Sequence, residues 1–448
     1  MSKLAQRSLP VVIGASYNIE KPTGPDDNPN ERLIREAKKK AVEYYGNNGR
    51  TVSSKIYRII LKPGTIPGVP VEVDLNKNLI PVYGVVPTFM LEVMRLTRLT
   101  DRIAAVGSDD VGLYVEAYKD FRRMGGHGLD DRVTWAFEGT NLSLFNTVAR
   151  GISALNLKER EQFLFTTGDV PFADFREQLY DDDIEKGGMV IDFCGKKSIW
   201  GNEPELFPRN WYQIILQGMQ TTYVKEPNAF VFVNDPRILD MIGLFYREKR
   251  TKGVTQGEEF MDEITTHIQQ FFPQGRDPKE IIRFIECSLR TGIIYLAQKR
   301  PENSKIPGLY LSGQISTLGN RLLGYPMVFK AEHSDPMMLR DIDGFHDVGY
   351  YLMLMQEAAS KYGSMENAIK NLLPFGDEVI AFNEYLLSRG IPDRVPLIKY
   401  FPQIMNYYCD RLGIGRFYEG DRPVWQVLPN EDIQGSIAFL ENRTAQSR

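Results

Sequence analysis

Two acidic motifs, far apart in the chain, contain the residue types of a magnesium site. The first, FLFTTGDVPF at 163–172, is an apolar run that we expect to form a strand ending at Gly168 and Asp169. The second, RDIDGFHDV at 340–348, offers Asp341 and Asp343 ahead of a predicted helix. Mg²⁺ prefers carboxylate and phosphate oxygens, and ligands of open α/β sheets bind at the carboxyl ends of the strands. Asp169 and Asp343 are therefore candidate ligands of one ion.

Each motif also has an ordinary structural explanation. Asp169 can cap the turn that follows a strand, and the residue types alone leave this role and metal binding about equally supported. The acidic residues of 340–348 can cap a helix, with Asp347 in its first turn where the helix dipole favours a negative charge. Taken alone, the second motif favours capping.

Two further segments could contact a phosphorylated nucleotide. DLNKNLIPVYGVVPT at 74–88 places Lys77 just before an apolar strand, where its ammonium could balance phosphate charge, although a lone loop lysine is usually solvated. EGTNLS at 138–143 ends a predicted strand and opens a helix. Its amides and short polar side chains could hold a base, ribose or phosphate, and helix capping explains them equally well.

The elements around these motifs alternate between short apolar strands and amphipathic helices. Strands are predicted at 9–13, 102–106, 132–136, 162–166, 229–233 and 326–330. Between them, apolar residues three and four apart predict helices at 88–98, 113–124, 143–155 and 236–250. This alternation is typical of a mostly parallel, doubly wound α/β sheet of Rossmann-like type.

Two regions interrupt the alternation and suggest a division of the chain. Residues 20–70 begin with a turn-rich stretch, continue through a charged helix at 31–45 and a strand near 55–61, and read as an insertion over the open edge of the sheet. Beyond Gly349 four amphipathic helices are predicted, at 350–362, 365–373, 378–388 and 396–412. We therefore predict an α/β domain over 1–349, able to fold alone, and an all-α appendage over 350–448 that could mediate homo-oligomers.

Composition narrows the classes of partner. The 54 basic and 58 acidic residues give a net charge of −4, which disfavours nucleic-acid binding. The three cysteines show no disulfide or zinc spacing, no stretch has the length of a membrane span, and the first residues lack a secretion signal. A cytoplasmic protein is expected.

Taken in order, these motifs resemble the nucleotidyltransferases of GT-A-like (nucleotide-diphospho-sugar transferase) fold, including molybdopterin nucleotidyltransferase-like members, over about residues 10–350. The resemblance implies transfer from a nucleoside triphosphate to a small phosphorylated acceptor, expected to be a sugar phosphate, with release of pyrophosphate. It implies Mg²⁺ on Asp169 and Asp343, with Asp341 the less favoured ligand, and phosphate contact by Lys77. The nucleotide contacts that it implies are Gly14, Ala15, Ser16, Gly107, Gly139, Thr140, Asn141 and Gly168.

The chain departs from that family after its first predicted strand. The family has a glycine-rich loop with an arginine there, whereas here VIGASY at 12–17 keeps only Gly14. Either Lys21, Arg32 or Arg35 of the inserted segment replaces the missing charge, or turnover is altered or lost. Two alternatives stay open: a GT-A-type glycosyltransferase that uses a sugar nucleotide, and a non-catalytic nucleotide-binding or scaffold protein.

Overall fold

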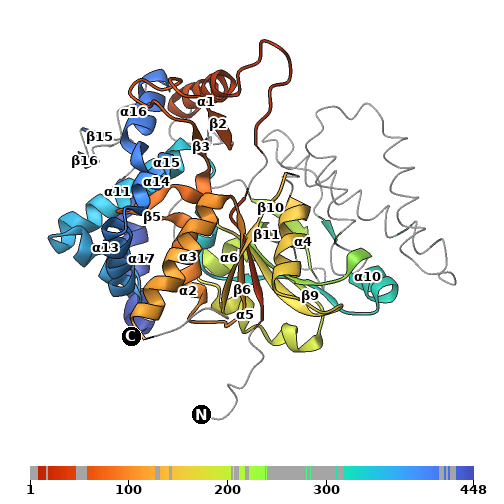
Figure 1. Cartoon of the computed structure of the whole chain (residues 1–448). Coiled ribbons are helices and arrows are strands. Elements are labelled where there is room, and N and C mark those ends of the chain that lie inside the picture. Colours follow the sequence, from red (N-terminus) through yellow and green to blue (C-terminus); the bar gives the residue numbers. More distant parts are fainter. Residues whose placement is uncertain are drawn as a thin grey trace.

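The computed structural model of the chain describes most of its residues (Figure 1). The described residues are 9–16, 19–46, 58–126, 132–140, 144–202, 205, 211–216, 221–237, 239, 279, 283, 309–310, 316–412, 418–419, 422–423 and 430–447.

A mixed sheet of ten strands forms the centre of the molecule (Figure 1). The strands run in the order β13-β10-β11-β9-β12-β8-β1-β6-β7, and β14 also pairs with β9. Among the described residues, five of its nine strand pairs are parallel. The strands are β1 (Val11–Gly14), β6 (Ile103–Gly107), β7 (Val133–Phe137), β8 (Gln162–Thr167), β9 (Met189–Gly195), β10 (Tyr212–Ile215), β11 (Thr221–Lys225), β12 (Ala229–Val233), β13 (Leu309–Tyr310) and β14 (Met327–His333).

The strands β7, β6, β1 and β8 form the parallel part of the sheet, and it is apolar on both faces. Alternate residues of one strand point to opposite faces. In β1, Val11 and Ile13 therefore enter one buried cluster, whereas Val12 enters a second cluster with Phe163 and Phe165. A strand that is covered on both faces needs apolar residues at successive positions, and the continuous apolar run of β1 meets this requirement.

Helices cover these two faces. The helices α2 (Thr88–Leu96) and α3 (Asp109–Met124) lie on one side of the sheet and α4 (Leu144–Ala154) on the other (Figure 1). Val148 of α4 packs in the cluster of Val12, and Tyr114 of α3 packs in that of Val11. The predicted α/β class, with a mixed and mostly parallel central sheet, is therefore confirmed, and the arrangement is consistent with a Rossmann-like fold.

The remaining part of the sheet differs most from the prediction. All six predicted strands are present, but β12 runs antiparallel to both β8 and β9, and β9, β10 and β11 were not predicted. The predicted helix at 236–250 lies mostly outside the described residues.

The inserted segment contains the predicted charged helix, α1 (Pro29–Gly46), and β2 (Ile59–Leu61), which pairs with β3 (Val73–Leu75). α1 lies against α16 (Phe401–Leu412), where Tyr408 donates a hydrogen bond to Asn30 and Arg411 contacts Glu31 at 2.6 Å. After β3 come η1 (Lys77–Leu79), β4 (Pro81–Tyr83) and β5 (Val86–Pro87).

The C-terminal helices form a group beside α2 and α3 (Figure 1). They are α11 (Phe345–Tyr362), α12 (Met365–Leu372), α13 (Gly376–Ser388), α14 (Ile391–Arg394), α15 (Pro396–Lys399), α16 and α17 (Asn430–Ser447), with a short β15 (Tyr418–Glu419) and β16 (Arg422–Pro423) between the last two. The predicted single helix at 396–412 is two helices, because a proline is tolerated only in the first turn and Pro402 therefore begins a new helix.

These helices share one buried core with the α/β part. Phe382 of α13 contacts Tyr118 of α3 with ring centroids 5.3 Å apart, and Glu378 accepts a hydrogen bond of 2.6 Å from the same tyrosine. The division near Gly349 stays a prediction, although α11 already begins at Phe345. Within the described residues, we find no helix with the length and apolar character needed to cross a bilayer.

The shorter helical elements connect the strands of the sheet. They are α5 (Arg176–Leu179), η2 (Asp182–Lys186), α6 (Lys196–Trp200), α10 (Ser316–Leu323) and η5 (Pro336–Leu339).

Candidate functional site

Asp169 lies at the point where the strand order of the parallel sheet reverses. From β1 the chain continues outward through β6 to β7, and then returns to the other side of β1 as β8. Ligands of open α/β sheets bind at such a point, beyond the carboxyl ends of the strands. Asp169 follows β8 directly, and Gly168 donates its N–H to the carbonyl of Gly14 at 3.1 Å.

Gly168 keeps this turn close to the neighbouring loops. A Cβ atom on Gly168 would lie 2.9 Å from the Cβ of Phe89 and 3.1 Å from Oδ1 of Asn78, both too close for ordinary contact. The glycine of the Thr-Gly-Asp motif is therefore required by packing.

The segment that carries Asp341 and Asp343 is attached to the Asp169 turn by its backbone. Ile342 donates its N–H to the carbonyl of Asp169 at 2.9 Å. Asp347 lies in the first turn of α11, as predicted, and its carboxylate accepts the N–H groups of Asp343 and Gly344 at 3.0 and 2.8 Å. Since Asp347 caps the helix, the side chains of Asp341 and Asp343 are left to face Asp169.

Lys77 lies between two of these carboxylates. Its Nζ is 2.5 Å from Oδ2 of Asp169 and 2.9 Å from Oδ1 of Asp343. The short helix η1 holds it there, since Asn76 caps the helix by accepting the N–H of Asn78 at 3.1 Å. The lysine is only 5% exposed, so it is not solvated as a loop lysine usually is.

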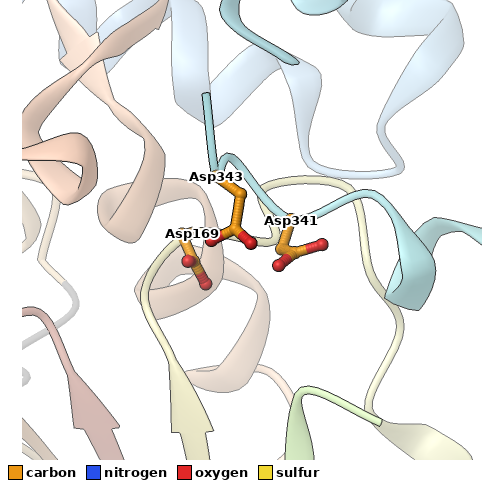
Figure 2. Close-up of side chains that lie close together, drawn as sticks. All are labelled: Asp169, Asp341 and Asp343. Carbon is orange, nitrogen blue, oxygen red and sulfur yellow. The ribbon is translucent and has the colours of Figure 1, made fainter. Parts of the chain in front are cut away.

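The three carboxylates form one cluster. Each of Asp169, Asp341 and Asp343 offers an oxygen within 4.8 Å of the others, and Figure 2 shows the Asp343 carboxylate between the other two. Together with Lys77 these side chains carry a formal charge of −2, the complement of a divalent cation. Carboxylate oxygens suit a hard ion, so the cluster could hold one.

A fourth carboxyl group, which was not predicted from the sequence, lies at the turn that carries Asp169. Glu92 of α2 is fully buried, and its Oε1 accepts the N–H of Val170 at 2.9 Å. Burial, with a further contribution from the charge of Asp169, raises the pKa of Glu92 well above its usual range. This buried carboxyl supports the turn through its bond to Val170. Its signal in the sequence is a single acidic residue in the otherwise apolar run TFMLEVM at 88–94.

The residues expected to contact the nucleotide lie along the same edge of the sheet. Gly14 ends β1 with Ala15 and Ser16 after it, Gly107 ends β6, and Gly139 and Thr140 follow β7. These strands run parallel to β8, and β1 is its direct neighbour, so all of these residues lie at the carboxyl ends of the strands, on the same edge of the sheet as Gly168. Asn141 lies outside the described residues.

The inserted segment contributes an arginine to this edge, but it is not one of the three expected from the sequence. Arg32 is engaged within the insertion by Glu20 and Asp27, and Lys21 and Arg35 are exposed. Arg58 instead reaches Glu138, at the end of β7, with its guanidinium 2.7 Å from the carboxylate.

Arg58 belongs to a buried network with an excess of acid. It also contacts Asp74 at 2.6 Å, and burial raises the pKa of Glu138 in spite of the arginine. Burial and the charges of Asp74 and Asp109 raise the pKa of Asp110 to about 6. The edge beside β1, β6 and β7 is therefore polar and acidic rather than lined by a glycine-rich loop.

Comparison with known proteins adds little to this description. No protein family and no curated protein matches the chain. Among solved structures, one that matches is described as a glucose-1-phosphate thymidylyltransferase from Bacillus anthracis in complex with sucrose. It is 13% identical, the match covers 44% of this chain and 75% of that one, and the TM-score is 0.27. A likeness at this level carries no argument about function.

Proposed function

We propose that the protein is a magnesium-dependent nucleotidyltransferase that joins a nucleoside triphosphate to a small phosphorylated acceptor, with a sugar phosphate as the expected acceptor. The oxygen of the acceptor phosphate attacks the α-phosphorus, the bond to the bridging oxygen breaks, and pyrophosphate leaves. GT-A-like character of the sheet is part of this proposal.

One observation carries the proposal: three carboxylates and a buried lysine meet at the switch point of an α/β sheet. The side chains come from three separate segments of the chain, so local capping does not explain why they lie together. Their excess of two negative charges disfavours a bare polyphosphate and favours one that arrives with a divalent cation.

Each residue has a defined part in the reaction. Asp169, Asp343 and Asp341 would hold Mg²⁺, which supplies charge neutralisation at the phosphate oxygens. Lys77 would offset the negative charge that develops in the transition state, and the polar edge formed by Gly14, Ser16 and the 138–140 turn would bind base and ribose. Catalysis of this kind needs positioning and charge, and no side-chain nucleophile.

The test is a screen of nucleoside triphosphates and sugar phosphates with Mg²⁺, in which released pyrophosphate is measured. Asp169→Asn should lower turnover on the order of 100-fold or more, as loss of one group that stabilises transition-state charge commonly does. Asp393→Asn removes a carboxylate that is 73% exposed and pairs with Lys399, and it should leave turnover unchanged. Equal turnover in wild type and Asp169→Asn would refute the assignment.

The Asp341-Ile342-Asp343 triplet keeps a second candidate open, because both of its carboxylates approach Asp169. A glycosyltransferase would use the same cluster to bind the diphosphate of a sugar nucleotide. Free nucleoside diphosphate released from a sugar nucleotide, without pyrophosphate from a triphosphate, would support this reaction. Nucleotide binding without either product would support a non-catalytic protein.

A further inference from the structure

The last helix of the chain, α17, lies against the two loops that carry the carboxylates. It is attached to α11 by a hydrogen bond of 2.5 Å between the hydroxyls of Tyr350 and Ser436, and by an ion pair of 2.5 Å between Lys361 and Glu441. These contacts dock the helix on its neighbour and involve neither loop.

Arg443 of α17 differs from these docking residues because it contacts both loops at once. Its Nη2 donates to the carbonyl of Phe172 at 2.6 Å, and its Nη1 donates to Oδ2 of Asp335 at 3.0 Å. The arginine and Asp335 side chains are 9% and 6% exposed. Both interactions are therefore protected from solvent, where a charged hydrogen bond is strongest.

Asp335 extends the link from Arg443 into both loops. Its Oδ2 also accepts the N–H of Asp174 at 2.6 Å, and its Oδ1 accepts the N–H of Met337 at 2.9 Å. Phe172 and Asp174 belong to the turn that begins at Asp169. Asp335 begins the segment that leads through η5 to Asp341 and Asp343.

We propose that Arg443 is a positioning residue, which clamps the two carboxylate loops together so that the C-terminal helix completes the metal site. The inference rests on the proposed function for its metal, but it concerns residues that contact neither metal nor substrate. The planar guanidinium offers donors in a fixed fork, and this geometry matches a carbonyl on one loop and a carboxylate on the other. A lysine would present its donors from a single nitrogen and so lacks this fixed fork.

The rival explanation is that α17 merely stabilises the fold, and three variants separate the two explanations. Arg443→Met removes the clamp, Arg443→Lys retains the charge but not the fork, and Glu441→Gln weakens the docking of α17 without touching either loop. Each full-length variant is first compared with wild type by near-ultraviolet circular dichroism. Binding of Mn²⁺ alone is then titrated by electron paramagnetic resonance, since Mn²⁺ takes the same oxygen ligands as Mg²⁺.

We expect Arg443→Met to weaken Mn²⁺ binding about 10-fold to 100-fold, the usual effect of removing a group that orients metal ligands. Arg443→Lys should fall between this variant and wild type. Glu441→Gln should change affinity less than about twofold, because Glu441 is bound by Lys361 and Tyr362 of α11 and contacts neither loop. If Arg443→Met does not fold, the test rests on Arg443→Lys. Binding of Mn²⁺ by Arg443→Lys with the affinity of wild type would overturn the proposal.

An equal loss of affinity in Glu441→Gln would also overturn it, since docking of the helix would then be sufficient. Pyrophosphate release is measured separately on the same samples. If Mn²⁺ affinity depends on Arg443 but the protein releases no pyrophosphate, the proposed role of Arg443 stands and the proposed reaction is rejected. If wild type binds no Mn²⁺, both are rejected.

Discussion

Replacing Lys77 with methionine tests the electrostatics of the site, because it removes the ammonium between Asp169 and Asp343 and keeps the length of the side chain. The Lys77 and Asp169 side chains are 6% and 2% exposed. Water therefore cannot screen the carboxylate that remains. Without a metal, the variant should be less stable than wild type as well as inactive.

The magnitude follows from this burial. Removal of one partner from a buried ion pair costs about 3–5 kcal/mol. Mg²⁺ stabilises both proteins, but it should bind the variant more tightly because a competing cation is gone. At saturating Mg²⁺, each tenfold difference in Kd narrows the deficit in unfolding free energy by about 1.4 kcal/mol. Part of the deficit should therefore disappear, while turnover stays on the order of 100-fold lower because the ammonium is absent.

Thermal unfolding in EDTA and in Mg²⁺, with pyrophosphate release measured alongside, provides the assay. In EDTA the Tm of Lys77→Met should lie roughly 5 °C below wild type, and Mg²⁺ should narrow that gap. Lys399→Met is the matched control, since Lys399 and its partner Asp393 are 43% and 73% exposed. An unchanged Tm in EDTA, or a gap that Mg²⁺ does not narrow, would refute the electrostatic argument.

Two further predictions concern stability. Burial lowers the pKa of His333, but the hydrogen bond and charge of Glu177, 2.6 Å away, outweigh this and raise it. The pair therefore contributes fully below about pH 6.5, and the contribution is lost as the pH rises through the raised pKa. The Tm of wild type should fall relative to that of His333→Gln between about pH 6 and 9, and parallel pH profiles would count against the pairing. A chain ending at residue 349 should aggregate, because it cuts α11 and removes Phe382, which packs on Tyr118, so that this apolar surface is uncovered; a monomeric, cooperatively unfolding fragment would instead support two independent domains.

The parallel half of the sheet could be predicted from sequence because its central strands, β1, β6 and β8, are buried on both faces. A run such as LPVVI at 9–13 has few alternatives as a buried strand. An apolar run shows where a strand lies but not its direction, so β12 could be located while its antiparallel pairing could not be predicted. β9 was missed because it contains Asp192, whose carboxylate accepts the N–H groups of Glu332 and His333 in the neighbouring strand.

The acidic residues of the candidate site could be predicted from the sequence, but the residues that hold them in place could not. The sequence could not decide which aspartate of 340–348 caps α11, because each is near enough to do so. The structure gives that part to Asp347 and leaves Asp343 for the cluster. Arg443 and Glu92 were not selected, because their partners are backbone groups and a carboxylate distant in the chain, which no local pattern reveals.

The supports explain how three like charges can lie within 4.8 Å of one another. Carboxylates at this separation repel, so the cluster exists only if the rest of the fold offsets the repulsion. The backbone bond from Ile342 to Asp169 fixes the two loops to each other, and the buried Glu92, whose pKa is raised, holds the turn through its bond to Val170. The ammonium of Lys77 offsets part of the repulsion, and a divalent cation would offset more of it. An arrangement that costs stability and is supported in these three ways agrees better with the proposed ligand site than with a role in folding alone.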